Sequence, residues 1–329
     1  MKINTFNLST LGVAAAMMGT LVAAAVMAPP TGVTVAPKAS FSISSFAQSA
    51  VALLHVKPMH RAERNNLPND QSDAYEVVVI DGLDYDLDSI ISGVGYVPRV
   101  QLASMPEDLA NIRAVNYKKE IFFKTVLPLV LQINEEISAD RQRLKNISAQ
   151  IKAGTHLAAT DKLWLAIMAD RYNVRRNDID AILARHDVVP PSLALAQAAS
   201  ESAWGTSRFV REGNAMFGQW TFSDTKEGLV PNKRSIGKSH RVQTFSSLMA
   251  SVRSYVNNLN RHRAYREFRK ARTAMRAKGG PIDGYLLATT LHRYSERGDV
   301  YVSELQSIID TNALRSLDNA RLMDIDPLI

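Results

Sequence analysis

The chain has 329 residues, 46% of them hydrophobic and 22% charged, which is the composition of a globular protein with one substantial core plus extensions or with two modest domains. It has no cysteine, which excludes disulfides, thiolate catalysis and cysteine-ligated zinc. The net charge of +7 suits an anionic partner, whether nucleic acid, a lipid surface or a cell-wall polymer, and does not choose among them.

Residues 1–28 have the features of an export segment. Lys2 is the only charged residue before Lys38, and an apolar run extends from about Leu8 to Ala28. This pattern is typical of a secretory signal, and the run approaches the roughly 20 residues that span a bilayer. Pro29 makes a poor cleavage context, so a cleaved signal peptide and a retained membrane anchor both stay open. We expect an exported protein, in the periplasm or on the periplasmic face of the inner membrane.

The remainder predicts a mainly α protein with a small β-hairpin lobe. Residues 29–111 are predicted to be a linker and partly ordered extension, with a strand-like run at 75–80. A glycine-containing stretch at 213–245 predicts a loop and hairpin. We place the main domain at 112–318, followed by a tail at 319–329. Apolar spacing predicts helices over about 116–151, 160–173, 176–186, 191–203, 246–260, 262–277, 283–293 and 300–318.

Glu201 is the candidate catalytic residue. It ends an apolar helix of small residues within SLALAQAASESAWGTSRF, residues 192–209. Close packing there would desolvate the carboxyl and raise its pKa, as a general acid for glycosidic cleavage requires. Trp204 lies three residues later, on the same helical face, and could cover the carboxyl or stack on a sugar. On composition alone, a solvent-exposed helix-end glutamate is an equally good interpretation.

Two further clusters suit a carbohydrate. REGNAMFGQWTF, at 211–222, interleaves amides with aromatic rings around two glycines, and sugars need flat apolar platforms beside hydrogen-bonding groups. LHRYSERGDVYVSEL, at 291–305, offers a tyrosine that could orient an acetamido group or stabilise developing positive charge. Purely structural aromatic clusters are the alternative for both. The predicted substrate contacts are Asn214, Phe217, Gly218, Gln219, Trp220 and Tyr301, together with Trp204, and Tyr294 is the second predicted catalytic residue.

Several separated segments resemble the bacterial Bax-type proteins of the glucosaminidase family, glycoside hydrolase family 73. The resemblance runs through roughly residues 95 to 310. It is carried by VPRVQLASMPEDLA at 97–110, LPLVLQINEEISADRQRL at 127–144, ALAQAASESAWGTSRFVREGNAMFGQW at 194–220, GLVP at 228–231 and RYSERGDVYVSEL at 293–305. So many motifs in one order are far more specific than a single short pattern.

The resemblance implies a lysozyme-like, mostly helical fold and hydrolysis of the β-1,4 bond following N-acetylglucosamine in peptidoglycan. It places the family's catalytic glutamate on Glu201 and its active-site tyrosine on Tyr294, with subsite positions on Trp204, Asn214, Phe217 and Gly218. Family names also refer to mannosyl-glycoprotein endo-β-N-acetylglucosaminidase, which makes host N-glycans a remote alternative substrate.

The second catalytic group is not identified by the sequence. Many family members carry a second carboxylate in the β region, where this chain offers only Asp224 and Glu227, neither within a matched motif. Inversion by two carboxylates, attack by the substrate's own N-acetyl oxygen and direct attack by water all stay open, and substrate assistance is favoured. A lytic transglycosylase and a non-catalytic wall-binding protein are the rival functions.

The remaining signals have ordinary interpretations. Nine Lys and Arg residues between 253 and 278 could bind an anionic polymer, but a solvated helix face is the more common explanation of such a run. His240 has no partner ligands in sequence, and no histidine pair has metalloprotease spacing, so we expect neither a metal nor an organic cofactor. We expect peptidoglycan glycan strands as the partner, no nucleic acid, membrane contact only through the N-terminal segment, and a monomer.

Overall fold

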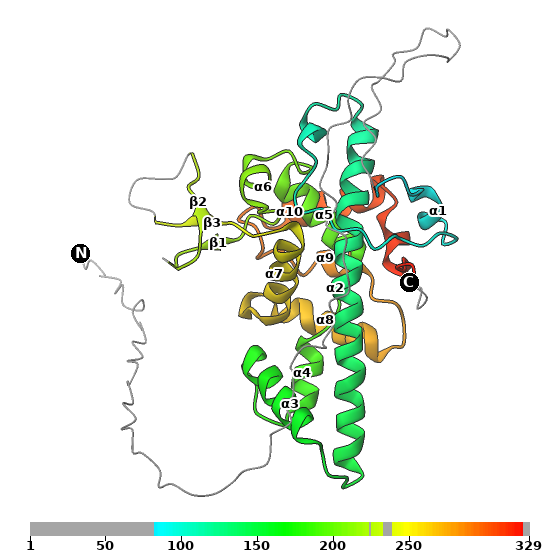
Figure 1. The fold of residues 1–329 in the computed structure, drawn as a ribbon, viewed down its shortest axis with the longest axis vertical. Helices are drawn as coiled ribbons and strands as arrows, with labels where there is room; N and C mark the ends of the chain where they lie inside the picture. The colour runs from blue at the N-terminus through cyan, green and yellow to red at the C-terminus, as the bar shows by residue number, and fades with distance from the viewer. Residues whose placement is uncertain (1–81, 224, 233–238, 325–329) are drawn as a thin grey trace, which may run out of the picture. The chain divides into compact units, whose positions relative to one another are not determined.

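The computed structural model describes residues 82–223, 225–232 and 239–324 (Figure 1). The predicted export segment and the strand-like run at 75–80 lie outside these residues, and the predicted domain boundaries stay predictions. None of the helices in these three ranges is both long and apolar enough to cross a membrane.

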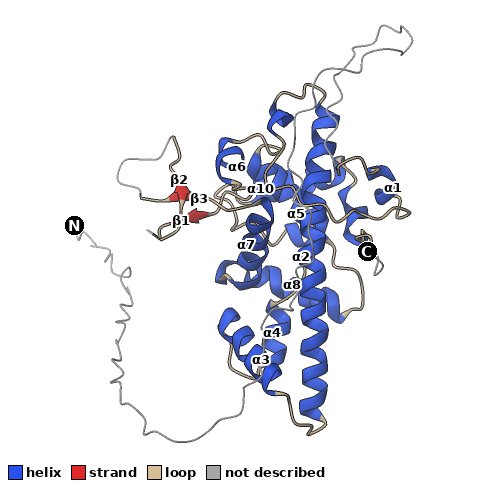
Figure 2. Ribbon diagram, in the orientation of Figure 1, coloured by secondary structure: helices blue, strands red, loops and turns tan. Residues whose placement is uncertain are grey.

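The prediction of a mainly α fold with a small β lobe is confirmed. Helices make up nearly all of the regular structure, and the strands form one small group beside them (Figure 2). The helices and helical turns are α1 Leu87–Ile91, η1 Glu107–Ala110, α2 Val115–Lys152, α3 Ala159–Tyr172, α4 Ile179–Arg185, α5 Pro191–Ser202, α6 Arg208–Gly213, α7 Leu248–Arg261, η2 Arg263–Tyr265, α8 Arg266–Ala277, α9 Gly284–Ala288, α10 Asp299–Thr311 and η3 Leu314–Asn319.

The 38-residue helix α2 is the longest element and contributes to two hydrophobic cores. Its first two-thirds packs in the main core, which holds α5, α7 and α10, and its last part packs with α3 and α4 in a smaller core (Figure 1). Pro128 lies inside α2 and has no N–H to donate to the carbonyl of Lys124, four residues earlier. The Tyr85 hydroxyl donates to that carbonyl at 3.0 Å and so replaces the missing helical hydrogen bond.

The segment before α2 is part of the main core. Leu83, Leu87 and Ile90 are all buried in it. Val97 pairs with the C-terminal end of the described chain, because its N–H donates to the Arg321 carbonyl at 2.8 Å and its carbonyl accepts from the Met323 N–H at 2.9 Å. Residues far apart in sequence therefore close the core together.

The two predicted helices nearest the C-terminus differ most from the spacing-based prediction. The helix expected at 283–293 ends at Ala288, since the hydroxyls of Thr289 and Thr290 each donate to a carbonyl three residues earlier, at 2.7 Å. The helix expected at 300–318 is divided at Ala313, whose left-handed backbone (φ 51°) separates α10 from η3.

The predicted loop and hairpin at 213–245 is a three-stranded antiparallel sheet in the order β1-β3-β2. Trp220 pairs with Val242, and Leu229 pairs with the same residue from the other side. The strands are β1 Trp220–Thr221, β2 Gly228–Leu229 and β3 Arg241–Gln243.

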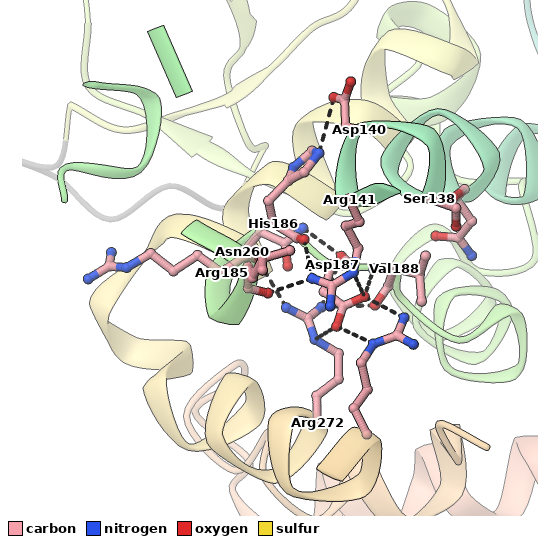
Figure 3. A network of polar contacts seen from close by, with 12 residues as sticks. Ser138, Asp140, Arg141, Arg185, His186, Asp187, Val188, Asn260 and Arg272 are labelled. Atoms are coloured by element: carbon pink, nitrogen blue, oxygen red, sulfur yellow. Dashed lines mark hydrogen bonds and ion pairs between the residues drawn. The ribbon is translucent and has the colours of Figure 1, made fainter. Parts of the chain in front are cut away.

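A buried carboxylate ties the helices together at the link between α4 and α5. Asp187 accepts two hydrogen bonds from Arg276, both at 2.6 Å, and lies 3.3 Å from Arg141 and 3.8 Å from the fully buried Arg272 (Figure 3). Burial by itself would raise the pKa of Asp187, but the hydrogen bond from Arg276 and the three positive charges outweigh it and lower the pKa. The carboxylate thus stays ionised and joins α2 and α8.

Candidate active site

Helix α5 carries the candidate catalytic residue through the middle of the main core. Ser192 to Ala199 are all buried, because alanines let neighbouring helices approach closely. At the N-terminus of α5, the Asp318 carboxylate accepts from the Ser192 N–H at 2.8 Å, from the Ser192 hydroxyl at 2.9 Å and from the Gly284 N–H at 3.1 Å. These bonds fix the start of the helix that positions Glu201.

Glu201 lies in the last turn of α5 and lines an open groove with a volume of about 2000 Å³. Pockets for small ligands are typically about 300–1,000 Å³, so the groove has room for part of a polymer chain. Its lining residues come from α3 and α4, from the β lobe, and from α7, α8 and the segment before α10.

Burial raises the pKa of Glu201 above its ordinary value. A hydrogen bond with Tyr301 and the positive charge of Arg297 oppose this rise, whereas the negative charge of Glu304 adds to it. Glu304 is itself occupied, because it forms an ion pair with Arg297 and accepts from the Ser200 hydroxyl at 2.6 Å. A carboxyl with a raised pKa that is open to a groove keeps its proton to higher pH than an ordinary carboxyl, as a general acid requires.

A chain of buried hydrogen bonds supports Glu201 from the protein side. The Tyr255 hydroxyl donates to Gln197 Oε1 at 2.7 Å, and Gln197 Nε2 donates to the Tyr301 hydroxyl at 2.9 Å. Tyr301 in turn forms the hydrogen bond with Glu201. Every member of this chain except Glu201 is fully buried, so the geometry around the carboxyl is fixed by packing.

The wall of the groove beside Glu201 is aromatic. Phe217 stacks on Tyr255 with ring centroids 3.9 Å apart, and its carbonyl accepts from the Tyr294 hydroxyl at 3.3 Å. Gly218 has a positive φ of 57°, and a Cβ on it would lie 3.7 Å from Glu201 Oε2. The backbone thus passes directly by the carboxyl. Burial raises the pKa of Tyr294 well above its ordinary value, so its hydroxyl stays neutral.

The β lobe contributes a second part of the groove. Trp220 is 58% exposed and stacks on His240 with ring centroids 4.3 Å apart. Gln219 lines the groove next to it, and its amide contacts the Ser254 carbonyl at 3.5 Å. Phe217, Gly218, Gln219, Trp220 and Tyr294, all predicted from sequence, therefore lie together with Glu201.

Trp204 is placed differently from the spacing-based prediction. Ala203 and Trp204 both adopt left-handed backbone angles, with φ of 51° and 57°, so α5 ends before the i+3 relationship can apply. The Trp204 ring packs edge-on against Phe122 and Phe123 in α2, with centroids 5.7 and 5.5 Å apart. It lines the core and not the groove.

Three other predicted residues also lie away from the groove lining. Asn214 and Glu227 line a separate, smaller hollow beside α6, and the Asn214 amide donates to the Phe245 carbonyl at 3.2 Å. Tyr301 is fully buried and contacts Glu201 from the core side. Asp224 lies outside the described residues.

Sequence reasoning did not identify Gln197, Tyr255 and Tyr265 as parts of the site. Gln197 lies four residues before Glu201, and this i, i+4 spacing of two polar residues in an apolar helix was the available signal. Tyr255 and Tyr265 lie in other elements, and no local pattern links them to Glu201. Glu296 is exposed and lines the groove, and with Asp170 and Glu201 it supplies the carboxylates among the described lining residues.

Comparisons with known proteins identify the family of the chain. The family model described as "Mannosyl-glycoprotein endo-beta-N-acetylglucosaminidase" (Glucosaminidase) matches residues 177–314, which include Glu201 and both aromatic clusters. The chain is 32% identical over 216 residues to "Protein bax" of Escherichia coli (strain K12), covering 64% of this chain and 75% of that protein. No solved structure matches the chain. On this evidence of sequence and domain, the chain belongs to the glucosaminidase family, as a Bax-type member.

Proposed function

We propose that this protein is an endo-β-N-acetylglucosaminidase that hydrolyses β-1,4 glycosidic bonds in peptidoglycan, with Glu201 as the general acid. The observation that carries the proposal is a carboxyl of raised pKa in an open groove too large for a small ligand. The exposed ring of Trp220 adds a platform of the kind that packs against sugar rings.

In the proposed reaction Glu201 protonates the glycosidic oxygen as the bond to the anomeric carbon breaks. The substrate's N-acetyl oxygen attacks that carbon from the other face, and water then opens the resulting ring with Glu201 as the base. The neutral Tyr294 hydroxyl, beside the Phe217 carbonyl, orients the acetamido group.

Substrate assistance is favoured because two other carboxylates that could act as a second catalytic group are either held by other residues or lie outside the groove. Glu304 is held by Arg297 and Ser200, and Glu227 lines the other hollow. Of the two other described carboxylates that line the groove, Asp170 lies 4.0 Å from Arg176, and Glu296 could instead serve as a base. Product NMR that showed inversion at the anomeric carbon would exclude substrate assistance.

We further propose that the protein acts on the exported side of the membrane, where its substrate lies. The charged and apolar N-terminal pattern supports this location. Expression of the full chain followed by cell fractionation tests it, and recovery of the protein only from the cytosol would contradict it.

The central experiment is digestion of purified sacculi by the wild type and by Glu201→Gln, which keeps the size of the side chain and removes the acid. New reducing ends on N-acetylglucosamine are expected with the wild type, and general acid catalysis predicts about a 10²–10⁴-fold lower rate with the variant. Mass spectrometry separates the outcomes: a 1,6-anhydro product would indicate a lytic transglycosylase. Digestion of the sacculi at equal rates by both proteins would exclude Glu201 as the acid. If the wild type produced no new ends at all, the rival function of a non-catalytic wall-binding protein would be favoured.

A further inference from the structure

Eight of the nine basic residues between 253 and 278 divide into two sets with different surroundings, and the ninth, Lys278, is exposed and does not line the groove. The first set is engaged within the protein. Arg253 forms an ion pair with Glu136, Arg272 and Arg276 bind Asp187 (Figure 3), and Arg269 donates to the Leu259 and His262 carbonyls at 2.9 and 2.8 Å. These cations hold helices together and are not available to a ligand.

The second set consists of Arg261, Arg263, Arg266 and Lys270, which we call the basic arm. All four side chains are exposed and line the same groove as Glu201, at the end of α7, in η2 and on the first turns of α8. Arg261, Arg263 and Lys270 form no ion pair with any other residue that the structure describes, and Arg266 lies 3.5 Å from the adjacent Glu267.

The groove as a whole has an excess of positive charge. Among its described lining residues, nine are Lys or Arg and three are Asp or Glu. The pKa of Arg269 is lowered to about 10, first by burial and then by the positive charges of Arg185 and Arg266. Arg269 thus lies close enough to Arg185 and Arg266 to be repelled by them, and an anionic group bound at this end of the groove would relieve that repulsion.

This charge does not fit the sugar backbone of the proposed substrate. N-acetylglucosamine is uncharged, and the lactyl carboxyl of N-acetylmuramic acid is neutral where it forms the amide bond to a peptide stem. The anionic groups of a strand that carries stems are therefore the carboxylates of those stems. Arginine guanidinium groups bind carboxylates by paired hydrogen bonds of fixed geometry. We propose that the basic arm binds the peptide-stem carboxylates of the strand whose sugars lie at Glu201. This inference rests on the proposed function and specifies which form of the polymer the groove selects.

The test measures binding in the Glu201→Gln background, so that it does not depend on turnover. The probes are purified sacculi in three forms: untreated, freed of phosphate polymers with hydrofluoric acid, and amidated at their carboxylates with carbodiimide and ammonia. Sedimentation gives the bound fraction of the full-length protein at each concentration.

The test variant is Arg261→Gln/Arg263→Gln/Arg266→Gln/Lys270→Gln. The matched control, Lys145→Gln/Lys152→Gln/Lys162→Gln/Lys278→Gln, removes the same charge from exposed positions that do not line the groove. Circular dichroism and thermal unfolding establish that both variants are folded.

We expect the test variant to bind untreated sacculi about tenfold more weakly than the control, since four exposed charge contacts each contribute modestly. Amidation of the sacculi should weaken the binding of the parent protein, Glu201→Gln, by a similar factor. It should leave the binding of the test variant nearly unchanged. Equal binding by variant and control would overturn the inference, and a loss on hydrofluoric acid treatment alone would assign the arm to phosphate instead. If carboxylate-dependent binding is found but the wild type cleaves nothing, only the proposed function fails.

Discussion

Gln197 donates a hydrogen bond to the Tyr301 hydroxyl at 2.9 Å, one helical turn before Glu201. Because the Tyr301 oxygen accepts this hydrogen bond, the Tyr301 O–H is left to donate to the Glu201 carboxylate. The orientation of the candidate acid thus depends on residues that no substrate reaches.

The pH dependence of activity should reveal this hydrogen bond. Protonated Glu201 is the active form, and its raised pKa means that activity persists to higher pH than an ordinary carboxyl would allow and is lost as pH rises through that pKa. Tyr301 stabilises the ionised form, so Tyr301→Phe should raise the pKa further. The alkaline limb of kcat/KM should move to higher pH, with a lower maximum rate. Tyr285→Phe, away from the groove lining, is the control. A shift to lower pH would contradict the assignment.

Trp204 and Trp220, both predicted from the sequence to contact the substrate, should respond differently to the same substitution. Trp204→Ala removes a ring packed between α2 aromatics and should lower the free energy of unfolding by about 3–5 kcal/mol. Trp220→Ala removes an exposed ring from the groove and should raise KM by about fivefold to tenfold with little change in stability. Urea unfolding and initial-rate kinetics measure the two effects. A stable Trp204→Ala with raised KM would contradict the placement of that ring.

Glu296 allows the catalytic mechanism to be tested. If the substrate's N-acetyl group is the nucleophile, Glu296→Gln should lower kcat by less than about tenfold, whereas loss of a general base costs about 10²–10⁴-fold. Glu267→Gln, an exposed glutamate on α8 that does not line the groove, is the matched control. A hundredfold loss confined to Glu296→Gln would favour a two-carboxylate mechanism.

Asp318 should make the stability of the fold depend on pH. Burial raises its pKa from 3.8 to about 6, so the folded state holds a proton that the unfolded chain has released between these values. Its contribution is therefore fully present below pH 3.8 and is lost as pH rises through about 6. Asp318→Asn has no carboxyl to titrate at this position. The free energy of unfolding of the wild type minus that of the variant should therefore be larger at pH 4 than at pH 7, by up to about 3 kcal/mol. Denaturant unfolding at both pH values measures it, and a larger difference at pH 7 would contradict the shift.

The sequence predicted the fold where local patterns are strong. Apolar spacing located α2, α5 and α7 to within a few residues, because each presents a continuous buried face. The mixture of glycines, amides and aromatic residues at 217–220 likewise predicted residues that line the groove.

The rest depends on contacts that local patterns do not encode. Left-handed backbone at Ala203 and Trp204 is unusual for these residue types, so the direction of the Trp204 ring was not predictable from helical spacing. Tyr301 lies on α10, and only packing against α5 reveals that it is buried against Glu201 and does not face the substrate. In the same way, the engaged and the exposed cations of the basic stretch can be told apart only when their partners in the fold are known, such as Glu136 in α2 and Asp187.

The anchoring of α5 by Asp318 determines how short a working fragment of this protein can be. The family match ends at residue 314, four positions before Asp318, and begins at 177, after all of α2. A fragment trimmed to those limits would leave Ser192 and Gly284 without their acceptor and would lose the pairing of Val97 with the chain end near Leu322. Recombinant fragments for crystallisation should therefore include the core residue Leu83 at one end and Met323, which bonds to Val97, at the other.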